Sequence, residues 1–136
     1  MAFVLKTPIQ KRFSDIDSFC HVNNVSQQMY FDLGKQEFYQ KMLPERVLTG
    51  KRRIITAATS TSYLGQIRMQ DDIYVTTTVS KIGTKSITLF QRLICRKPDG
   101  SEEVRTESTS VMVAFDFELQ ESFPVPNEWR QHLLQE

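Results

Sequence analysis

Four stretches of alternating apolar and polar residues, joined by short connections, fill the second half of the chain. They lie within residues 51–63, 73–79, 87–95 and 104–117. Alternation with a period of two is typical of half-buried strands, and short connections are typical of antiparallel neighbours. Turn signals at Gly83-Thr84-Lys85 and Lys97-Pro98-Asp99-Gly100 separate the last three stretches. Residues 3–13 are a further expected strand, in which Pro8 favours an edge position.

The side chains expected to face the core are one set from each alternation, most of them apolar. They are Ile55, Ala57, Thr59, Thr61 and Tyr63; Ile73, Val75, Thr77 and Val79; Ile87, Leu89, Gln91, Leu93 and Cys95; and Val111, Val113, Phe115 and Phe117.

A helix is expected before these strands, over Val25–Met42, with Asn24 as its N-cap, Gln27 three residues on and Pro44 beyond its end. Its apolar stripe is expected to be Val25, Met29, Leu33 and Phe38, flanked by Tyr30, Phe31 and Met42. Gly34 costs about 1 kcal/mol relative to Ala inside a helix, so we expect a close approach to another backbone there.

A short second helix, Glu128–Gln135, is expected after Asn127 as its cap. The pattern as a whole predicts an α+β fold with five antiparallel strands around one helix.

The totals fit one domain, residues 1–136, of ordinary globular composition. A formal net charge of +1 argues against a general nucleic-acid partner. No apolar run is long enough to span a membrane, and the first six residues, Met1–Lys6, lack the apolar core of a signal peptide. Cys20 and Cys95 do not suggest a disulfide framework, so a reducing cytoplasm is expected.

One polar loop, residues 14–23, stands directly before the long helix and carries Asp15, Asp17, His21 and Asn23. A helix N-terminus presents free N–H groups and the positive end of a dipole, which stabilise a developing negative charge. A carboxylate beside it is a candidate base or nucleophile. The alternative is that Asp15 and Asp17 only form side-chain-to-backbone turns.

Asp15-Ile16-Asp17, His21-Val22-Asn23-Asn24, Tyr30-Phe31-Asp32 and Gly34-Lys35 follow one another in this region. Together they resemble the hot-dog-fold acyl-CoA thioesterases of the 4-hydroxybenzoyl-CoA thioesterase type, and the resemblance extends over nearly the whole chain. It implies a five-stranded antiparallel sheet wrapped around one long central helix. It also implies a homodimer or homotetramer, an acyl-CoA or acyl-carrier-protein thioester as substrate, and no cofactor beyond the coenzyme A of the substrate.

The resemblance places the catalytic carboxylate at Asp17, as general base or nucleophile. Backbone N–H groups around Asn23 and Asn24 are expected to bind the oxyanion. Asp15 is expected to orient the loop. His21 can orient Asp17 or the substrate, bind a metal, or satisfy the loop backbone, and we favour the structural role. A metal site built from Asp15, Asp17 and His21 is not expected, because no second histidine lies near them in the sequence.

Two positions depart from the family pattern. Cys20 stands where the family usually has glycine, and Gln27 stands where an aromatic residue is common; both are candidates for contact with the substrate. Lys85 and Ser86, and the pair Arg52-Arg53, are candidates for contact with coenzyme A phosphates. Cys20 as a nucleophile beside His21 is not favoured, because adjacent side chains on an extended chain point apart.

A thioester hydrolase is therefore the leading hypothesis. The alternative is a non-catalytic acyl-CoA-binding hot-dog module, which the departures at Cys20 and Gln27 motivate. A hydratase or dehydratase on the same fold is less favoured, because His21 is followed by Val22-Asn23-Asn24. A purely structural protein is least favoured.

Overall fold

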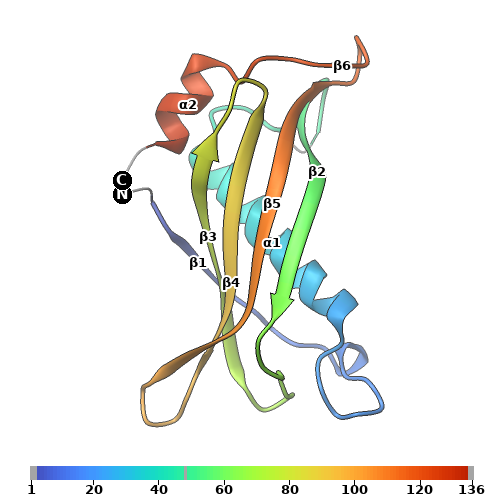
Figure 1. Ribbon diagram of the computed structural model, residues 1–136, viewed down its shortest axis with the longest axis vertical. Helices are drawn as coiled ribbons and strands as arrows, with labels where there is room; N and C mark the ends of the chain where they lie inside the picture. The colour runs from blue at the N-terminus through green and yellow to red at the C-terminus, as the bar shows by residue number, and fades with distance from the viewer. Residues whose placement is uncertain (1–2, 48, 135–136) are drawn as a thin grey trace.

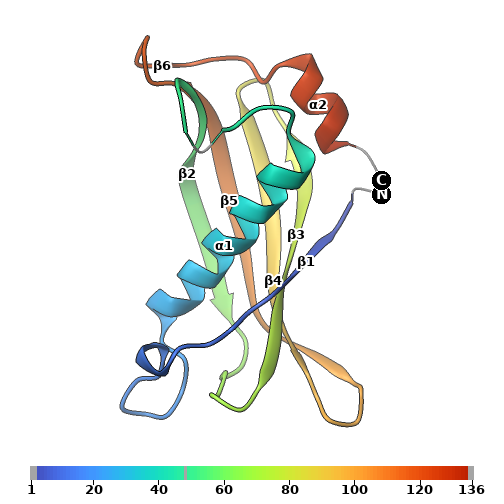
Figure 2. The same ribbon diagram turned by 180° about the vertical axis from the view of Figure 1, so that it is seen from behind.

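A single antiparallel sheet lies across one long helix, α1 (Asn24–Met42), in the computed structural model, which describes residues 3–47 and 49–134 (Figures 1 and 2). The strands are β1 (Leu5–Pro8), β2 (Arg52–Tyr63), β3 (Asp72–Ile82), β4 (Ser86–Arg96), β5 (Glu102–Asp116) and β6 (Glu121–Ser122). Their order is β1-β3-β4-β5-β2, and β6 pairs with the end of β5. The fold class is therefore as predicted, with β6 as a sixth strand too short to recognise by alternation.

The two edge strands of the sheet, β1 and β2, differ in length. β1 contains Pro8 and pairs only with β3, as expected of an edge strand, but it is much shorter than the predicted residues 3–13. The chain leaves the sheet after Pro8 and forms a 3₁₀ turn at Phe13–Asp15. At the other end, β2 pairs with β5 along one side only.

Near the C-terminus, α2 (Asn127–Leu133) has Pro126 at its N-cap position, so the expectation that Asn127 caps it is wrong. Proline fits the turn before the helix for two reasons: its φ is fixed at a suitable value, and the N–H group that it lacks needs no partner at that position. The predicted end of this helix, Gln135, lies outside the described residues. Within the described chain, no helix has the length and apolarity needed to cross a membrane.

The buried face of α1 differs from the predicted stripe. Val25, Met29 and Leu33 are exposed. The buried apolar residues of α1 are Tyr30, Phe31, Phe38, Tyr39 and Met42. Both sets recur at helical spacing, so periodicity alone does not decide the rotation of the helix. The helix turns its larger, aromatic face and Gly34 to the sheet.

In the sheet, the predicted inward residues of β3 and β4 are buried, whereas β5 and part of β2 differ. β5 turns Thr106, Ser108, Ser110, Met112 and Ala114 towards the helix, not Val111, Val113, Phe115 and Phe117. A bulge in β2 between Thr56 and Ala58 reverses its alternation. Ile54 is buried before the bulge, and Thr59, Thr61 and Tyr63 pair with the inward residues of β5 after it.

The apolar core is divided into two clusters. One contains Phe38, Leu89, Met112 and Trp129, near α2, and the other contains Phe31, Val75, Leu93 and Ile67, near the polar loop. Between them runs a row of polar side chains in one register across four strands, here called the polar row. Its members are Thr77, Gln91, Ser108 and Thr61.

Gly34 packs on this row. A Cβ at Gly34 would lie 2.8 Å from Val75 Cγ1, 2.9 Å from Thr77 Oγ1 and 3.0 Å from Gln91 Nε2. The approach is therefore close, but its neighbours are side chains of the sheet, so the expected approach to another backbone is wrong.

Candidate active site

The polar loop is a tight turn held by its own backbone. Ile16 and Val22 form an isolated antiparallel bridge. Inside it, Asp17 N donates to His21 O at 2.9 Å and Cys20 N donates to Asp17 O at 3.0 Å. The loop between the 3₁₀ turn and α1 is thus closed on itself, which holds Asp17 and His21 in a defined position before the helix.

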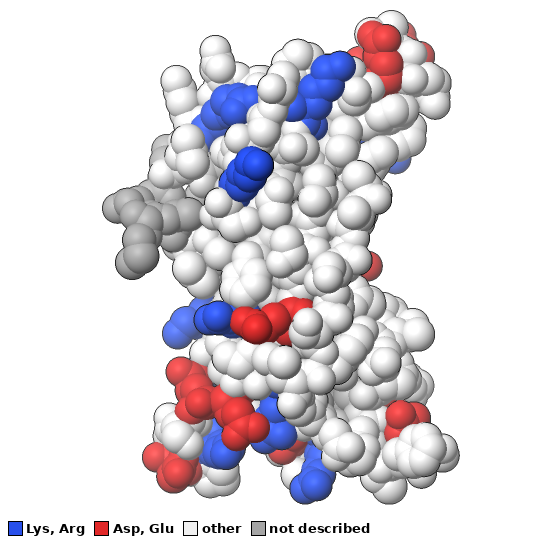
Figure 3. All heavy atoms as spheres, viewed as in Figure 1, with Lys and Arg blue, Asp and Glu red and all other residues white. Residues whose placement is uncertain are grey.

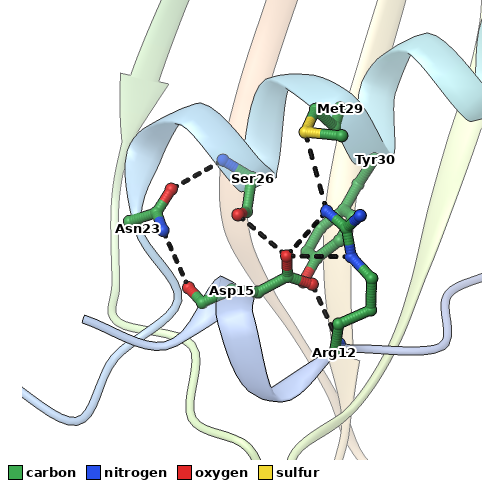
Figure 4. Close-up of polar contacts among 6 residues, drawn as sticks. All are labelled: Arg12, Asp15, Asn23, Ser26, Met29 and Tyr30. Atoms are coloured by element: carbon green, nitrogen blue, oxygen red, sulfur yellow. Dashed lines mark hydrogen bonds and ion pairs between the residues drawn. The ribbon is translucent and has the colours of Figure 1, made fainter.

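Asp15 ties this loop to α1 from a fully buried position (Figure 4). Its carboxylate accepts hydrogen bonds from Ser26 Oγ at 2.9 Å, from the hydroxyl of Tyr30, and from Arg12 through the backbone N at 2.9 Å and Nη2 at 2.8 Å. The expected orienting role of Asp15 matches this geometry, because every donor on it comes from the turn or from the first two turns of the helix.

The charge state of Asp15 follows from this network. Burial alone would raise the pKa of Asp15, but hydrogen bonds from Tyr30, Arg12 and Ser26 outweigh it and lower the pKa to about 2. Burial, reinforced by the hydrogen bond to Asp15, raises the pKa of Tyr30. Asp15 is thus a permanent anion whose lone pairs are already used, so it is poorly suited to bind a metal or to act as a base.

Asn23, not Asn24, caps α1. Asn23 Oδ1 accepts from Ser26 N at 2.7 Å, and its Nδ2 donates to Asp15 O at 3.1 Å (Figure 4). The backbone N–H of Asn23 also donates to Asp15 O, at 2.9 Å. Of the two expected oxyanion donors, Asn23 is therefore already occupied, whereas the N–H of Asn24, the first residue of the helix, makes no hydrogen bond to the described residues.

Asp17 lines an open cavity of about 580 Å³ at the N-terminus of α1. The lining residues are Asp17, Phe19, His21, Val22, Asn24, Gln27, Tyr63, Leu64, Gly65 and Gln66. Asp17 Oδ1 accepts from Phe19 N at 2.9 Å and from His21 N at 3.3 Å. Its other oxygen, Oδ2, makes no hydrogen bond to the described part of the chain, so one oxygen holds the turn and one is free for chemistry.

Cys20 adopts a left-handed backbone conformation with φ of 65°. This is a conformation that glycine adopts without strain and that costs other residues free energy. The cysteine therefore keeps the turn for which the family pattern uses glycine. Its side chain is exposed and does not line the cavity.

Gln27 is buried at the inner wall of the cavity and does not complete a capping box. Its Nε2 donates to Val22 O at 3.4 Å, and its Oε1 accepts from Thr106 Oγ1 at 2.5 Å. With Asn23 as the cap, Gln27 lies one residue beyond the capping-box position, which explains this difference from the prediction.

Lys85 and Ser86 do not reach the cavity of their own chain. Ser86 begins β4 opposite Val113, whereas Leu93 lies opposite Thr106 at the level of the cavity. Seven residues of strand separate the two levels, about 23 Å at 3.3 Å per residue.

Arg52 and Arg53 lie at the same distant end of the sheet and stack on aromatic rings, Arg52 on Trp129 and Arg53 on Phe117. Figure 3 shows basic side chains gathered at this upper end and a mixture of acidic and basic side chains at the lower end.

Tyr63, Leu64 and Gly65 were not anticipated as site residues. Tyr63 is the last residue of β2 and the other two follow it, about forty residues after the polar loop; they come to the cavity because Leu64 N and Gly65 N both donate to Arg105 O at 2.9 Å. Only knowledge of the sheet order would have placed them there.

Comparison with known proteins gives the same fold over the whole described chain. A thioesterase from Bacillus stearothermophilus, described as predicted, matches with a TM-score of 0.83, at 24% identity over 96% of this chain and 94% of that one. A thioesterase from Thermus thermophilus, solved with coenzyme A and Zn, matches with a TM-score of 0.83 at 22% identity, over 96% and 97% of the two chains. A variant of 4-hydroxybenzoyl-CoA thioesterase solved with 4-hydroxybenzoyl-CoA matches with a TM-score of 0.87 at 12% identity, over 96% and 98%.

Among curated proteins, the uncharacterized protein YsmA of Bacillus subtilis (strain 168) is 28% identical over 90 residues, which are 65% of this chain. The aligned part spans 59% of the length of YsmA. The family model of the thioesterase-like superfamily matches residues 12–133. The class of enzyme expected from the sequence, a thioester hydrolase, is the class for which this family is named. The chain therefore belongs to the thioesterase-like superfamily and has the hot-dog fold that the resemblance predicted.

Proposed function

We propose that the protein hydrolyses an acyl-CoA thioester to the free acid and the thiol, with Asp17 as general base or nucleophile. The observation that carries the proposal is that Asp17 and Asn24, the first residue of α1, line the same cavity. Attack on a thioester carbonyl needs a base or nucleophile on the carbonyl carbon and a donor for the oxyanion. The free Oδ2 of Asp17 supplies the first, and the N–H of Asn24, strengthened by the helix dipole, supplies the second.

His21 positions Asp17 in this scheme and does not exchange protons with the substrate. Its backbone N–H donates to Asp17 Oδ1 at 3.3 Å, and its backbone O accepts from Asp17 N. Both contacts are made by the backbone of His21, so they fix the carboxylate whatever the charge of the imidazole.

The decisive experiment is thiol release from a panel of short, long and aromatic acyl-CoA thioesters by wild type, Asp17→Asn and Glu37→Gln. Glu37→Gln is the matched control, because Glu37 is an exposed carboxylate on α1. We expect Asp17→Asn to lose about 100-fold or more in kcat/KM, with an unchanged circular-dichroism spectrum, and Glu37→Gln to match wild type.

Activity that survives in Asp17→Asn would show that another residue carries the reaction. Tight acyl-CoA binding without turnover by wild type would instead favour the non-catalytic binding module. Turnover only with an acyl-carrier-protein thioester would replace coenzyme A by the carrier protein.

We propose further that the site is completed by a second copy of the chain. β2 offers a free edge of twelve residues, and exposed Phe19, Tyr63 and Leu64 surround the cavity mouth at its end. Long free edges and apolar patches of this kind are usually covered. A two-fold pairing of β2 with its copy would bring the Arg52 end of one chain beside the Tyr63 end of the other, so basic residues of one copy would approach the cavity of the other.

Lys85 and Ser86 are candidates for coenzyme A contact only in this arrangement, from the second copy. Light scattering after size exclusion should give at least a dimer. A charge substitution on the free edge, Thr59→Lys, should reduce the assembly towards a monomer, and a monomeric wild type that is fully active would contradict the arrangement.

A further inference from the structure

The cavity at Asp17 is polar on the side that faces β2. Tyr63 and Gln27 line this side. Gln28 Nε2 donates to Tyr63 OH at 3.2 Å and to Thr61 Oγ1 at 3.0 Å, and Thr61 Oγ1 lies 3.0 Å from Ser108 Oγ. A chain of hydrogen bonds therefore connects the wall of the cavity to the polar row of the sheet.

The inner face of β2 is open where the row begins. Among the described residues, α1 has its main contacts with β3 and β1, and the side chain of Gln28 reaches from α1 to β2. Thr59 is exposed, Thr61 is half-buried and Tyr63 is 42% exposed. An acyl group that extends from a carbonyl at Asp17 along this strand meets three hydroxyl groups in succession.

The far end of the row is buried and lacks one hydrogen-bond donor. Gln91 has no exposed surface, and its Nε2 donates to Phe31 O at 2.9 Å and to Thr77 Oγ1 at 3.0 Å. Its Oε1 has no partner among the described residues. Across the sheet, Ser108 of β5 stands opposite Gln91.

Packing alone does not explain this row. Gln91, Ser108 and Ser110 are between 0% and 2% exposed in the single chain, so they are not a solvated surface. The neighbouring inward positions of β4, Leu89 and Leu93, are apolar and fully buried. Buried polar groups cost stability unless they are satisfied, so a polar row that reaches the cavity at its open end, Thr61 and Tyr63, favours a polar ligand group there.

We propose that the acyl group of the substrate carries a hydroxyl substituent and that Thr61 and Gln28 bind this hydroxyl, with Ser108 holding the Thr61 hydroxyl from behind. The inference rests on the proposed function, because it starts the acyl group at Asp17. A saturated chain bound along β2 would displace water from the hydroxyl groups of Thr61 and Tyr63 without replacing the hydrogen bonds that the water makes. A hydroxyl substituent can both accept and donate hydrogen bonds there. The row thus selects hydroxyacyl thioesters over saturated ones of the same length.

The test compares hexanoyl-CoA with 3-hydroxyhexanoyl-CoA and 6-hydroxyhexanoyl-CoA, which differ from it by one oxygen. Initial rates of thiol release give kcat/KM for each, for wild type, Thr61→Val, Ser108→Ala and Thr109→Val. Thr109 is the control, because it is exposed and adjacent to Ser108 on the opposite face of β5. For wild type we expect at least one hydroxylated thioester to exceed hexanoyl-CoA by about tenfold or more.

The ratio of kcat/KM for the hydroxylated thioester to kcat/KM for hexanoyl-CoA should fall towards one in Thr61→Val and in Ser108→Ala. It should stay as in wild type in Thr109→Val. Equal or better turnover of hexanoyl-CoA by wild type would overturn the inference and leave the proposed function standing. A preference unchanged in both row variants would overturn it as well.

Failure of the proposed function is recognised separately. If wild type turns over none of the three thioesters, isothermal titration calorimetry gives their dissociation constants. These constants then decide whether the row binds a hydroxyacyl group. Tighter binding of a hydroxylated thioester by about tenfold would then support the row as a hydroxyacyl site on a non-catalytic module. Equal binding of all three thioesters, or no binding, would refute it.

Discussion

Gly34→Ala should destabilise the protein, although alanine is the better helix former. The added Cβ would lie between 2.8 and 3.0 Å from Val75 Cγ1, Thr77 Oγ1 and Gln91 Nε2. All three side chains have 0% exposure, so none can swing into solvent. Overpacking of this kind costs about 1–3 kcal/mol, and loss of the Gln91 hydrogen bond to α1 costs about 1 kcal/mol more.

The propensity gain from glycine to alanine, about 1 kcal/mol, offsets part of this cost. The net loss in the free energy of unfolding is then about 1–3 kcal/mol. With a urea m-value of about 1.5–2 kcal/mol per molar for a chain of this length, the urea midpoint should fall by about 0.5–2 M. Circular dichroism at one fixed protein concentration measures it, since an oligomer would make the midpoint depend on concentration.

A matched pair at Gln36, an exposed position two residues along α1, isolates the propensity term. Gln36→Ala should be more stable than Gln36→Gly by about 1 kcal/mol, the opposite sign to the change at Gly34. A Gly34→Ala variant as stable as wild type, or more stable, would refute the claim that the sheet side chains leave no room at this position.

Two further predictions concern the polar loop. Cys20→Gly should raise the free energy of unfolding by about 0.5–1 kcal/mol, because relief of the left-handed strain exceeds the extra backbone entropy of glycine; a thermal midpoint no higher than that of Cys20→Ala, which keeps a Cβ, would argue against strain. Asp15→Asn should cost about 3 kcal/mol at pH 7, because an amide has one acceptor oxygen and no charge for the donors of Arg12, Ser26 and Tyr30, which bind both carboxylate oxygens. Because the pKa of Asp15 is lowered, its contribution to the free energy of unfolding is complete above the ordinary pKa of 3.8 and is lost as the pH falls through about 2. The difference in urea midpoint between wild type and Asp15→Asn should therefore narrow from pH 4 to pH 2. A difference that stays constant would contradict the assigned role.

Where the sequence offered one consistent pattern, the fold could be predicted. Ile87, Leu89, Gln91, Leu93 and Cys95 alternate without interruption, and all are buried in β4. Their alternation leaves only one face that can meet the core, so strand identity and orientation follow together.

Where the local sequence was compatible with two orientations of a helix or strand, tertiary packing determined which one forms. α1 carries apolar residues on two faces, and its rotation depends on Gly34 fitting against β3 and β4, which no local pattern reveals. In β2, the bulge at Ala57 exchanges the inward and outward residues after it, and its sequence, Thr56-Ala57-Ala58, contains no glycine to mark it.

The candidate site was predictable where its residues are contiguous. Asp17, His21, Asn24 and Gln27 all line the cavity, because a closed turn and a helix start keep near neighbours together. The adjacent Asn23 and Asn24 are equally good caps by type, and the carbonyl of Asp15 selects Asn23.

The contribution of Tyr63 and the misplacement of Lys85 both depend on strand register. Register is decided by pairing across the sheet, and motif spacing within the chain carries no information about it.

The division of the core by the polar row has a consequence for how this protein can change. The cluster near α2, which includes Leu89 and Trp129, and the cluster near the polar loop, which includes Phe31 and Ile67, are separate groups of packed apolar side chains. Energetic effects of substitutions in separate, non-contacting groups add almost independently. The cluster near α2 can therefore maintain the fold while the residues around the cavity are exchanged, so that new acyl specificities are reached by single steps without compensating changes elsewhere in the core.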